Sequence, residues 1–275
     1  MSQLMAGKRG LIMGVANDHS IAWGIARALA AQGAELAFTY QGEHFGRRVR
    51  PLAASLGSTL IYHCDVEEAA TLSAVFDGLR TAWGSIDFVV HAIAFSDKAE
   101  LKGRYADTSK QNFVRTMLIS CYSFTEAARL AAELMPGGGS ILTLTYGGST
   151  RVMPNYNVMG VAKAALEASV RYLAADFGGR GIRVNAISAG PVRTLAGAGV
   201  SDARLMFGYQ RDNAPLRRAI TADDIGGAAV YLLSDLSRVV TGEIHYVDGG
   251  YNTVAMPRLE TLKSQDEKAA RDAAE

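Results

Sequence analysis

The chain has 275 residues, of which 49% are apolar and 20% charged, and its formal net charge is +1. This length fits one large α/β domain or two small ones, and the nearly balanced charge leaves no broad basic field for binding nucleic acid. The N-terminus shows no apolar run of signal-peptide length, and no apolar stretch of about 18 residues predicts a membrane span.

The cysteines and histidines argue against disulfides and metals. The two cysteines, Cys64 and Cys121, lie far apart in the sequence. A disulfide scaffold is therefore implausible, and we expect a cytoplasmic protein with reduced thiols. The five histidines show neither HxxxH nor HxH spacing, so we expect no metal site.

Short apolar runs alternate with amphipathic or alanine-rich segments along the chain. Strands are predicted at 10–13, 35–39, 60–63, 88–91, 141–145, 183–187 and 243–247, and helices at 21–32, 45–56, 67–82, 108–134, 156–177 and 222–233. Most of these strands are continuously apolar, which is typical of parallel strands covered on both faces. The order predicts an α/β fold with a single Rossmann-type, doubly wound parallel sheet of about seven strands.

One domain is expected, because no linker, repeat or composition shift divides residues 1–255. The segment 194–213 interrupts the alternation of strands and helices, and we interpret it as an insertion over the site. Residues 256–275 form a charged tail, which we expect to be a frayed helix or disordered at its end.

A glycine-containing turn follows the first predicted strand, from Gly14 to Gly24. Gly14 allows a tight turn and close approach of the backbone to a phosphate. Ser20 can cap the helix and offer its hydroxyl to a pyrophosphate, and Gly24 permits close helix–strand contact. An ordinary βα turn is compatible with the same residues, which do not form GxGxxG. The position in the first βα unit favours a dinucleotide site.

The next strand ends bear on the adenosine half of such a cofactor. A standard NAD site has an acidic residue after the second strand, where this chain has Gln41, with Glu43 beyond. No arginine directly follows this strand, which favours NADH over NADPH. Asp65, after the third strand, is compatible with binding adenine, with capping the next helix, or with both. Small residues at 92–94 would let the backbone lie flat beneath the ribose.

Tyr156 and Lys163 lie seven residues apart, in the helix after the fifth strand. Residues at this spacing share a helix face, about 10 Å apart along the axis. The tyrosine hydroxyl can therefore reach a substrate oxygen while the ammonium holds the nicotinamide ribose. We expect the ammonium to favour the phenolate and strengthen the hydroxyl as a donor. A core aromatic and a solvated lysine would show the same spacing, but Tyr146 at the end of strand five favours a catalytic reading.

These residues lie in stretches that resemble a known family. The stretches are GVANDHSIAWGIA, GAELAFTYQ, HCDV, HAIAF, ILTLTYGG, PNYNVMGVAKAALEASVRYLA, GIRVNAISAGPVRTLA and TGEIHYVDGG. They span nearly all of 6–255 and resemble the NADH-dependent enoyl-[acyl-carrier-protein] reductases of bacterial type II fatty-acid synthesis, a divergent branch of the short-chain dehydrogenases. Ordinary members have YxxxK. Here six residues separate Tyr156 from Lys163, and Gly160 stands where that lysine would be.

The resemblance implies a reaction and a set of residue roles. NADH would deliver hydride to the β-carbon of a trans-2-enoyl thioester carried on acyl carrier protein, Tyr156 would hold the enolate oxygen, and Lys163 would bind the nicotinamide ribose. Tyr146 and Tyr156 would be the active-site tyrosines. The implied cofactor-binding residues are Gly14, Ser20, Ile21, Gln41, Asp65, Val66, Ile93, Lys163, Val192, Arg193, Thr194, Leu195 and Ala196. The implied substrate-binding residues are Ser96, Tyr146, Tyr156 and Met206.

The resemblance also implies a homotetramer, and a lid at 194–213 over the acyl chain. A plain surface helix is the alternative for that segment. Acyl carrier protein is acidic, yet the basic residues near the lid, such as Arg204 and Arg211, form only a thin patch.

Two other functions remain as alternatives. A 3-ketoacyl carrier-protein reductase would share the fold and cofactor class, but it would call for a serine near strand five and YxxxK, which this chain lacks. A non-catalytic NAD-sensing protein would keep the cofactor loop and lose the tyrosine–lysine pair, which is present.

Overall fold

The computed structural model describes residues 3–194 and 203–263. Its strands are β1 (Arg9–Met13), β2 (Glu35–Tyr40), β3 (Ile61–His63), β4 (Phe88–His91), β5 (Gly139–Thr145), β6 (Ile182–Ala189) and β7 (Ile244–Val247). They form one parallel sheet in the order β3-β2-β1-β4-β5-β6-β7. This order confirms the predicted doubly wound sheet. Its switch point lies between β1 and β4, where ligands bind in such folds.

The helices agree with the prediction except at several boundaries. They are α1 (Ile21–Ala31), α2 (Gly42–Ser55), α3 (Ala69–Trp83), α4 (Lys110–Met117), α5 (Ser123–Ala132), α6 (Asn157–Gly178), α7 (Ala203–Asn213) and α8 (Ala222–Leu233). The predicted helix 108–134 is divided by a π-helical turn, Leu118–Tyr122, which joins α4 to α5. Such turns widen a helix locally and are common near functional sites.

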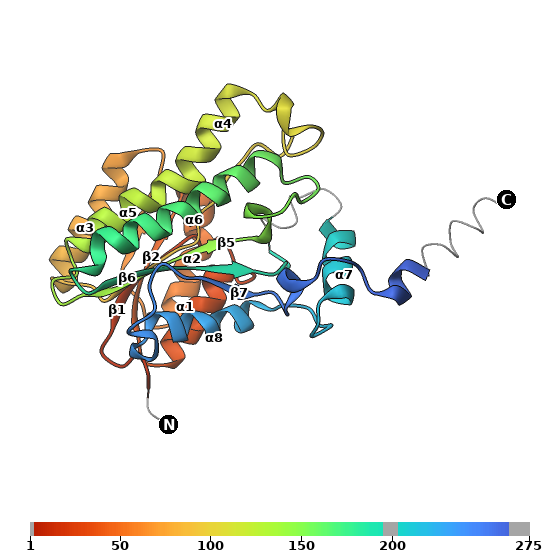
Figure 1. Ribbon diagram of the computed structural model, residues 1–275. Helices are drawn as coiled ribbons and strands as arrows, with labels where there is room; N and C mark the ends of the chain where they lie inside the picture. Colours follow the sequence, from red (N-terminus) through yellow and green to blue (C-terminus); the bar gives the residue numbers. More distant parts are fainter. Residues whose placement is uncertain (1–2, 195–202, 264–275) are drawn as a thin grey trace.

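Helices cover both faces of the sheet (Figure 1), and an apolar core lies between the helices and the sheet on each side. Side chains of α3, α5 and α6 pack on one face, and those of α1, α2 and α8 on the other. Successive strand residues point to opposite faces: Leu11 and Met13 join the first core, and Ile12 joins the second. The continuously apolar strands follow from this double burial.

Within residues 3–194 and 203–263, none of the helices has both the length and the apolar character needed to cross a membrane. Both cysteines are buried and free. Residues 264–275, most of the predicted tail, lie outside the described part of the chain.

The expected contact of Gly24 with a strand is wrong, because Gly24 packs against another helix. A Cβ built on Gly24 would lie 2.6 Å from the carbonyl oxygen of Ala222, at the start of α8. Gly226 of α8 approaches α1 equally closely, since its Cβ would lie 2.9 Å from the Gly24 carbonyl oxygen. These two glycines therefore set the separation of α1 and α8 beneath the cofactor loop.

We expect Gly24→Ala to destabilise the fold by about 1–3 kcal/mol, because the added methyl overpacks a backbone contact. Gly227→Ala in α8 is the matched control, since its added Cβ would meet no atom within 4 Å. It should instead stabilise the protein by about 0.5–1 kcal/mol through helix propensity. Urea unfolding of both variants measures the difference, and equal stabilities would contradict the proposed role of Gly24.

Candidate functional site

The turn after β1 requires a glycine at position 14. Gly14 has φ 102°, and a Cβ there would lie 2.1 Å from the carbonyl oxygen of Ala92, just after β4. The tight turn is thus confirmed, and the close approach is made to Ala92. The contact holds the β1 and β4 ends together at the switch point. The expected contacts of Gly14 and of neighbouring Ile93 with a dinucleotide stay predictions.

Ser20 precedes α1 but does not act as the predicted side-chain cap. Its Oγ accepts hydrogen bonds from the backbone N–H groups of Ala16 and Asn17, at 3.0 and 3.1 Å. The buried hydroxyl therefore shapes the loop itself. The Trp23 N–H of α1 donates to the Ser20 carbonyl oxygen at 3.0 Å. Within the described residues this leaves the N–H groups of Ile21 and Ala22 for another acceptor, as expected for an anion-binding helix start.

Two of the predicted adenosine-binding residues contact one another. Gln41 Nε2 donates to Asp65 Oδ2 at 2.9 Å, linking the ends of β2 and β3. The other oxygen of Asp65 accepts from the backbone N–H of Glu67 at 3.0 Å, whereas the N-cap position of α3 is Glu68. Asp65 thus orders the turn before α3 without being its N-cap, and Val66 beside it is buried.

A cation does lie near the end of β2, contrary to our expectation. Arg50, two turns along α2, reaches back to Glu43 with hydrogen bonds of 2.9 and 2.7 Å. Its guanidinium also lies over the ring of Tyr40, 4.8 Å from the centroid. The Arg50 hydrogen bonds hold the pKa of Glu43 at about 2, so this carboxylate offsets the cation. Glu43 and Arg50 lie seven residues apart in α2 and so share a helix face, a signal that sequence reasoning missed.

The two tyrosines expected at the active site lie together. The rings of Tyr146, directly after β5, and Tyr156 meet edge to face with centroids 5.2 Å apart. Two glycines permit this packing: a Cβ on Gly148 would lie 2.5 Å from the Tyr156 ring, and one on Gly160 would lie 2.7 Å from the Gly148 carbonyl oxygen. A lysine at position 160 would be incompatible with this close approach.

Two asparagines in the left-handed region flank Tyr156. Asn155 has φ 56° and Asn157 has φ 34°, which asparagine tolerates better than most residues. Asn157 Nδ2 also donates to the carbonyl oxygens of Glu100 and Gly103, at 3.4 and 3.3 Å. Helix α6 consequently begins one residue later than predicted, and its N-cap position is Tyr156.

Lys163 is buried, about two turns along α6. Its Nζ donates to the carbonyl oxygen of Leu144 in β5 at 2.8 Å. Burial lowers the pKa of Lys163 to about 8, and the nearby Cys121 and Glu167 counteract part of that effect. Glu167 itself is buried and accepts from Thr145 Oγ1 at 2.7 Å. Sequence reasoning missed Glu167, although its spacing four residues after Lys163 places it on the same helix face.

His91, at the end of β4, is a second buried titratable residue near Lys163. Its Nε2 lies 2.8 Å from Ser123 Oγ, and Ser123 Oγ donates to the Ile119 carbonyl oxygen in the π-helical turn. Burial, and secondly the charge of Lys163, lower the pKa of His91 to about 3. The imidazole is therefore neutral at physiological pH, and Lys163 is the cation of this buried group.

The expectation that Lys163 favours the Tyr156 phenolate is wrong for this structure. Burial, followed by the neighbouring Tyr146 and Glu167, raises the pKa of Tyr156 well above its ordinary value. Desolvation of the phenolate outweighs the attraction of an ammonium that is directed at Leu144. Tyr156 is thus a neutral phenol, which is the form that donates a hydrogen bond.

The remaining predicted residues are placed as follows. Ser96 is buried, and its Oγ accepts from Thr116 Oγ1 of α4 at 2.9 Å. Val192 is buried, Arg193 is exposed, and Met206 is half-buried in α7. Thr194 ends the first described range, and Leu195 and Ala196 lie outside the described residues. Their roles, like those of the other predicted contact residues, stay predictions.

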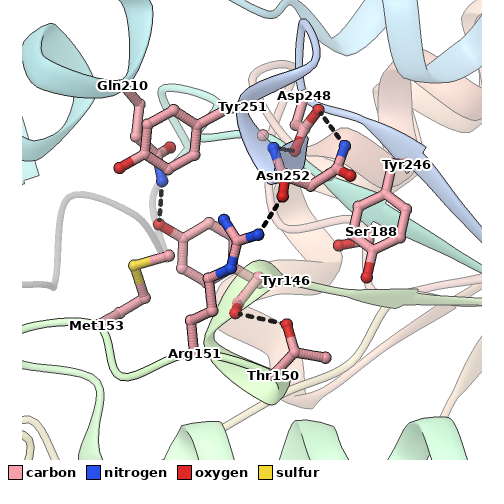
Figure 2. A pocket seen from close by; sticks show the side chains of 13 residues that line it. Tyr146, Thr150, Arg151, Met153, Ser188, Gln210, Tyr246, Asp248, Tyr251 and Asn252 are labelled. Atoms are coloured by element: carbon pink, nitrogen blue, oxygen red, sulfur yellow. Dashed lines mark hydrogen bonds between the residues drawn. The ribbon is translucent and has the colours of Figure 1, made fainter. Parts of the chain in front are cut away.

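Gln210 of α7 is a further residue that sequence reasoning missed. Its Nε2 donates to the Tyr146 hydroxyl at 2.9 Å, across a small cavity at the ends of β5, β6 and β7 (Figure 2). Gln210 falls in the predicted lid, 194–213. A polar residue in a predicted surface helix gives no indication that its side chain points into the protein. The contact joins α7 to the tyrosine pair.

A nicotinamide dinucleotide fits this set of residues. The Ile21 and Ala22 N–H groups at the start of α1 suit a pyrophosphate. The Gln41–Asp65 pair offers polar groups at the adenosine end, and Lys163 has donors beyond its bond to Leu144. When bound, the cofactor would supply a hydride close to Tyr156.

Comparisons with known proteins agree with this geometry. A family model described as "Enoyl-(Acyl carrier protein) reductase" matches residues 14–252. Enoyl-[acyl-carrier-protein] reductase [NADH] 2 of Rhizobium meliloti is 71% identical over 97% of this chain and 99% of its own length. The crystal structure of FabI from Candidatus Liberibacter asiaticus has a TM-score of 0.92 and 59% identity, covering 94% of this chain and 100% of that chain. The enoyl-(acyl-carrier-protein) reductase of Anaplasma phagocytophilum, solved in complex with NAD, has a TM-score of 0.91 and 60% identity, covering 94% and 99%.

Burial of the ammonium predicts that Lys163→Met stabilises the cofactor-free protein. The folded-state pKa of about 8 lies below the ordinary 10.5, so between these values the unfolded chain binds more protons and wild-type stability rises with pH. At pH 7 the variant should gain up to about 3 kcal/mol of unfolding free energy, and the gain should shrink by pH 10. Urea unfolding at both pH values measures this. The exposed Lys110→Met is the control, and a loss of stability at pH 7 would contradict the argument.

Proposed function

Because the chain belongs to the enoyl-(acyl carrier protein) reductase family, we propose that it reduces trans-2-enoyl thioesters carried on acyl carrier protein, with NADH as hydride donor. The observation that carries the proposal is the Tyr146–Tyr156 ring pair together with a buried Lys163, about two turns further along the helix that follows Tyr156. The family match over residues 14–252 supports it, as do the relatives named as NADH enzymes.

In this proposal Tyr156 stabilises the enolate. Hydride addition to the β-carbon places negative charge on the thioester oxygen, and the neutral Tyr156 hydroxyl donates a hydrogen bond to that oxygen. A donor held in place before the reaction stabilises the developing charge more than it stabilises the uncharged substrate, typically by a few kcal/mol. The tight packing of the ring against Gly148 supplies this preorganisation. The α-carbon is then protonated.

Lys163 is proposed to bind the nicotinamide ribose, and the remaining predicted cofactor residues to hold the adenosine and pyrophosphate groups. The ammonium is buried, so its interaction with ribose hydroxyls is little screened by water. The bond from Nζ to the Leu144 carbonyl oxygen fixes its direction. NADH is favoured over NADPH because Glu43 already occupies Arg50, the cation near β2.

The rival functions have less support. A 3-ketoacyl carrier-protein reductase would need a lysine where Gly160 packs on the Gly148 carbonyl oxygen. A non-catalytic NAD-sensing protein would have no use for a tyrosine pair with a buried ammonium, an arrangement that costs stability. We further propose a homotetramer, a substrate lid at 194–213 that includes Met206, and a cytoplasmic location, which the free cysteines favour.

The proposal predicts NADH oxidation, followed at 340 nm, with crotonyl or longer enoyl thioesters and little or none with acetoacetyl thioesters. Tyr156→Phe should lower kcat by about 10²-fold or more, while the Kd of NADH stays unchanged. Tyr172→Phe, on an exposed part of the same helix, is the control. Pure protein that leaves enoyl thioesters unreduced would refute the proposed activity.

NADH binding should weaken as pH rises above about 8, where the buried Lys163 loses its proton. The Kd, measured by NADH fluorescence, should rise by at most tenfold per pH unit. Lys163→Met should bind weakly at every pH and show no such slope. If this variant binds NADH as tightly as wild type, the assignment of Lys163 to the ribose is wrong.

A further inference from the structure

Tyr146 lines a cavity of about 40 Å³ that Tyr156 does not line (Figure 2). Tyr146 and Ser188 line it from the strand ends, Tyr251 and Asp248 from the segment after β7, and Gln210 from α7. Tyr146 therefore contacts both the other active-site tyrosine and a cavity that α7 helps to line. A residue that binds the Tyr146 hydroxyl from the cavity can therefore affect the active site.

Gln210 supplies that contact, and its own hydrogen bonding is incomplete. The side chain is 7% exposed, and its Nε2 donates to the Tyr146 hydroxyl at 2.9 Å. Its Oε1 finds no hydrogen-bond partner within residues 3–194 and 203–263. A buried carbonyl oxygen without a donor lowers the free energy of unfolding. An apolar side chain at position 210 would therefore stabilise the fold better than Gln210 does.

The direction of the bond matters for chemistry. Because the amide donates, the Tyr146 oxygen acts as acceptor and its own O–H stays free to donate elsewhere. The bond also fixes the position of the phenol oxygen and thereby the tilt of the ring. Since the Tyr146 ring meets Tyr156 edge to face, holding the first ring in place supports the position of the second.

We infer that Gln210 is a positioning residue, which orients the Tyr146 hydroxyl for reaction and makes that orientation depend on the docking of α7. Withdrawal of α7 would remove the donor, and Tyr146 would lose its fixed direction. The inference rests on the proposed function, specifically on the active-site role of Tyr146. It adds that the helix carrying Met206 acts on the tyrosine pair as well as on the acyl chain.

Two substitutions test the inference. Gln210→Met keeps the length and removes both polar groups, while Gln210→Glu keeps the shape and exchanges the donor for an acceptor. Both should lower kcat with crotonyl thioester about fivefold to tenfold, since one neutral hydrogen bond is at stake, with KM for NADH unchanged. Gln210→Met should also raise Tm by about 2 °C, because the unpaired carbonyl is gone.

This combination separates positioning from plain packing. If Gln210 served only to attach α7, Gln210→Met would lower Tm and raise KM for the thioester together, and that result would overturn the inference. Activity retained by Gln210→Glu would overturn the donor role. Gly227→Ala in α8, outside the proposed lid, is the control, since its added Cβ would meet no atom within 4 Å, and it should leave kcat unchanged.

A double-mutant cycle shows whether Gln210 acts through Tyr146. In a Tyr146→Phe background, Gln210→Met should have no further effect on kcat, because the phenol oxygen is absent. Additive losses would overturn the inference. A failure of the proposed function would look different. If Tyr146→Phe alone keeps full kcat, the active-site role of Tyr146 is wrong. If Tyr146→Phe lowers kcat but Gln210→Met does not, only the role of Gln210 is refuted.

Discussion

The site depends on the close approach of α6 to the segment after β5. Gly160 lies so near the Gly148 carbonyl oxygen that a Cβ would stand 2.7 Å away. This contact brings Tyr156 onto Tyr146, and it places Lys163, two turns along α6, directly over the Leu144 carbonyl oxygen. Side chains that give chemistry are thus positioned by two residues that have no side chain at all.

The sequence was a good guide to the sheet and to the tyrosine–lysine pair. Strands β1, β2 and β4 are buried on both faces over most of their length, so they appear as largely continuous apolar runs. The pair could be found because helix spacing maps directly onto a shared face. The ionisation of Tyr156 could not be found in this way, since it depends on how completely the phenol is desolvated and on where the ammonium points.

The residues that sequence reasoning missed differ in how far the sequence could have shown them. Arg50 lies seven residues after Glu43 in α2, the same spacing as Tyr156 and Lys163, so this contact was open to prediction. Gln210 reaches Tyr146 from a segment more than sixty positions away in the chain, and no local periodicity predicts such a contact. For Gly24 and Ser20 the positions were recognised from the sequence, but the predicted partners were wrong. Gly24 packs against α8, and Ser20 binds the backbone of its own loop.

The π-helical turn Leu118–Tyr122 has a consequence for how the site tolerates insertions and deletions. Before it, Thr116 of α4 holds Ser96, and after it, Ser123 of α5 holds His91. A widened turn accommodates one extra residue while the helix on either side keeps its phase, so deleting one residue of this turn would restore a regular α-helix with α4 and α5 in nearly the same orientation. Both hydroxyl contacts could then survive, whereas a deletion within α4 or α5 themselves would rotate one contact away by about 100°. The turn therefore marks a position where the helical rod can change length while it keeps both contacts at the carboxyl end of one strand, β4.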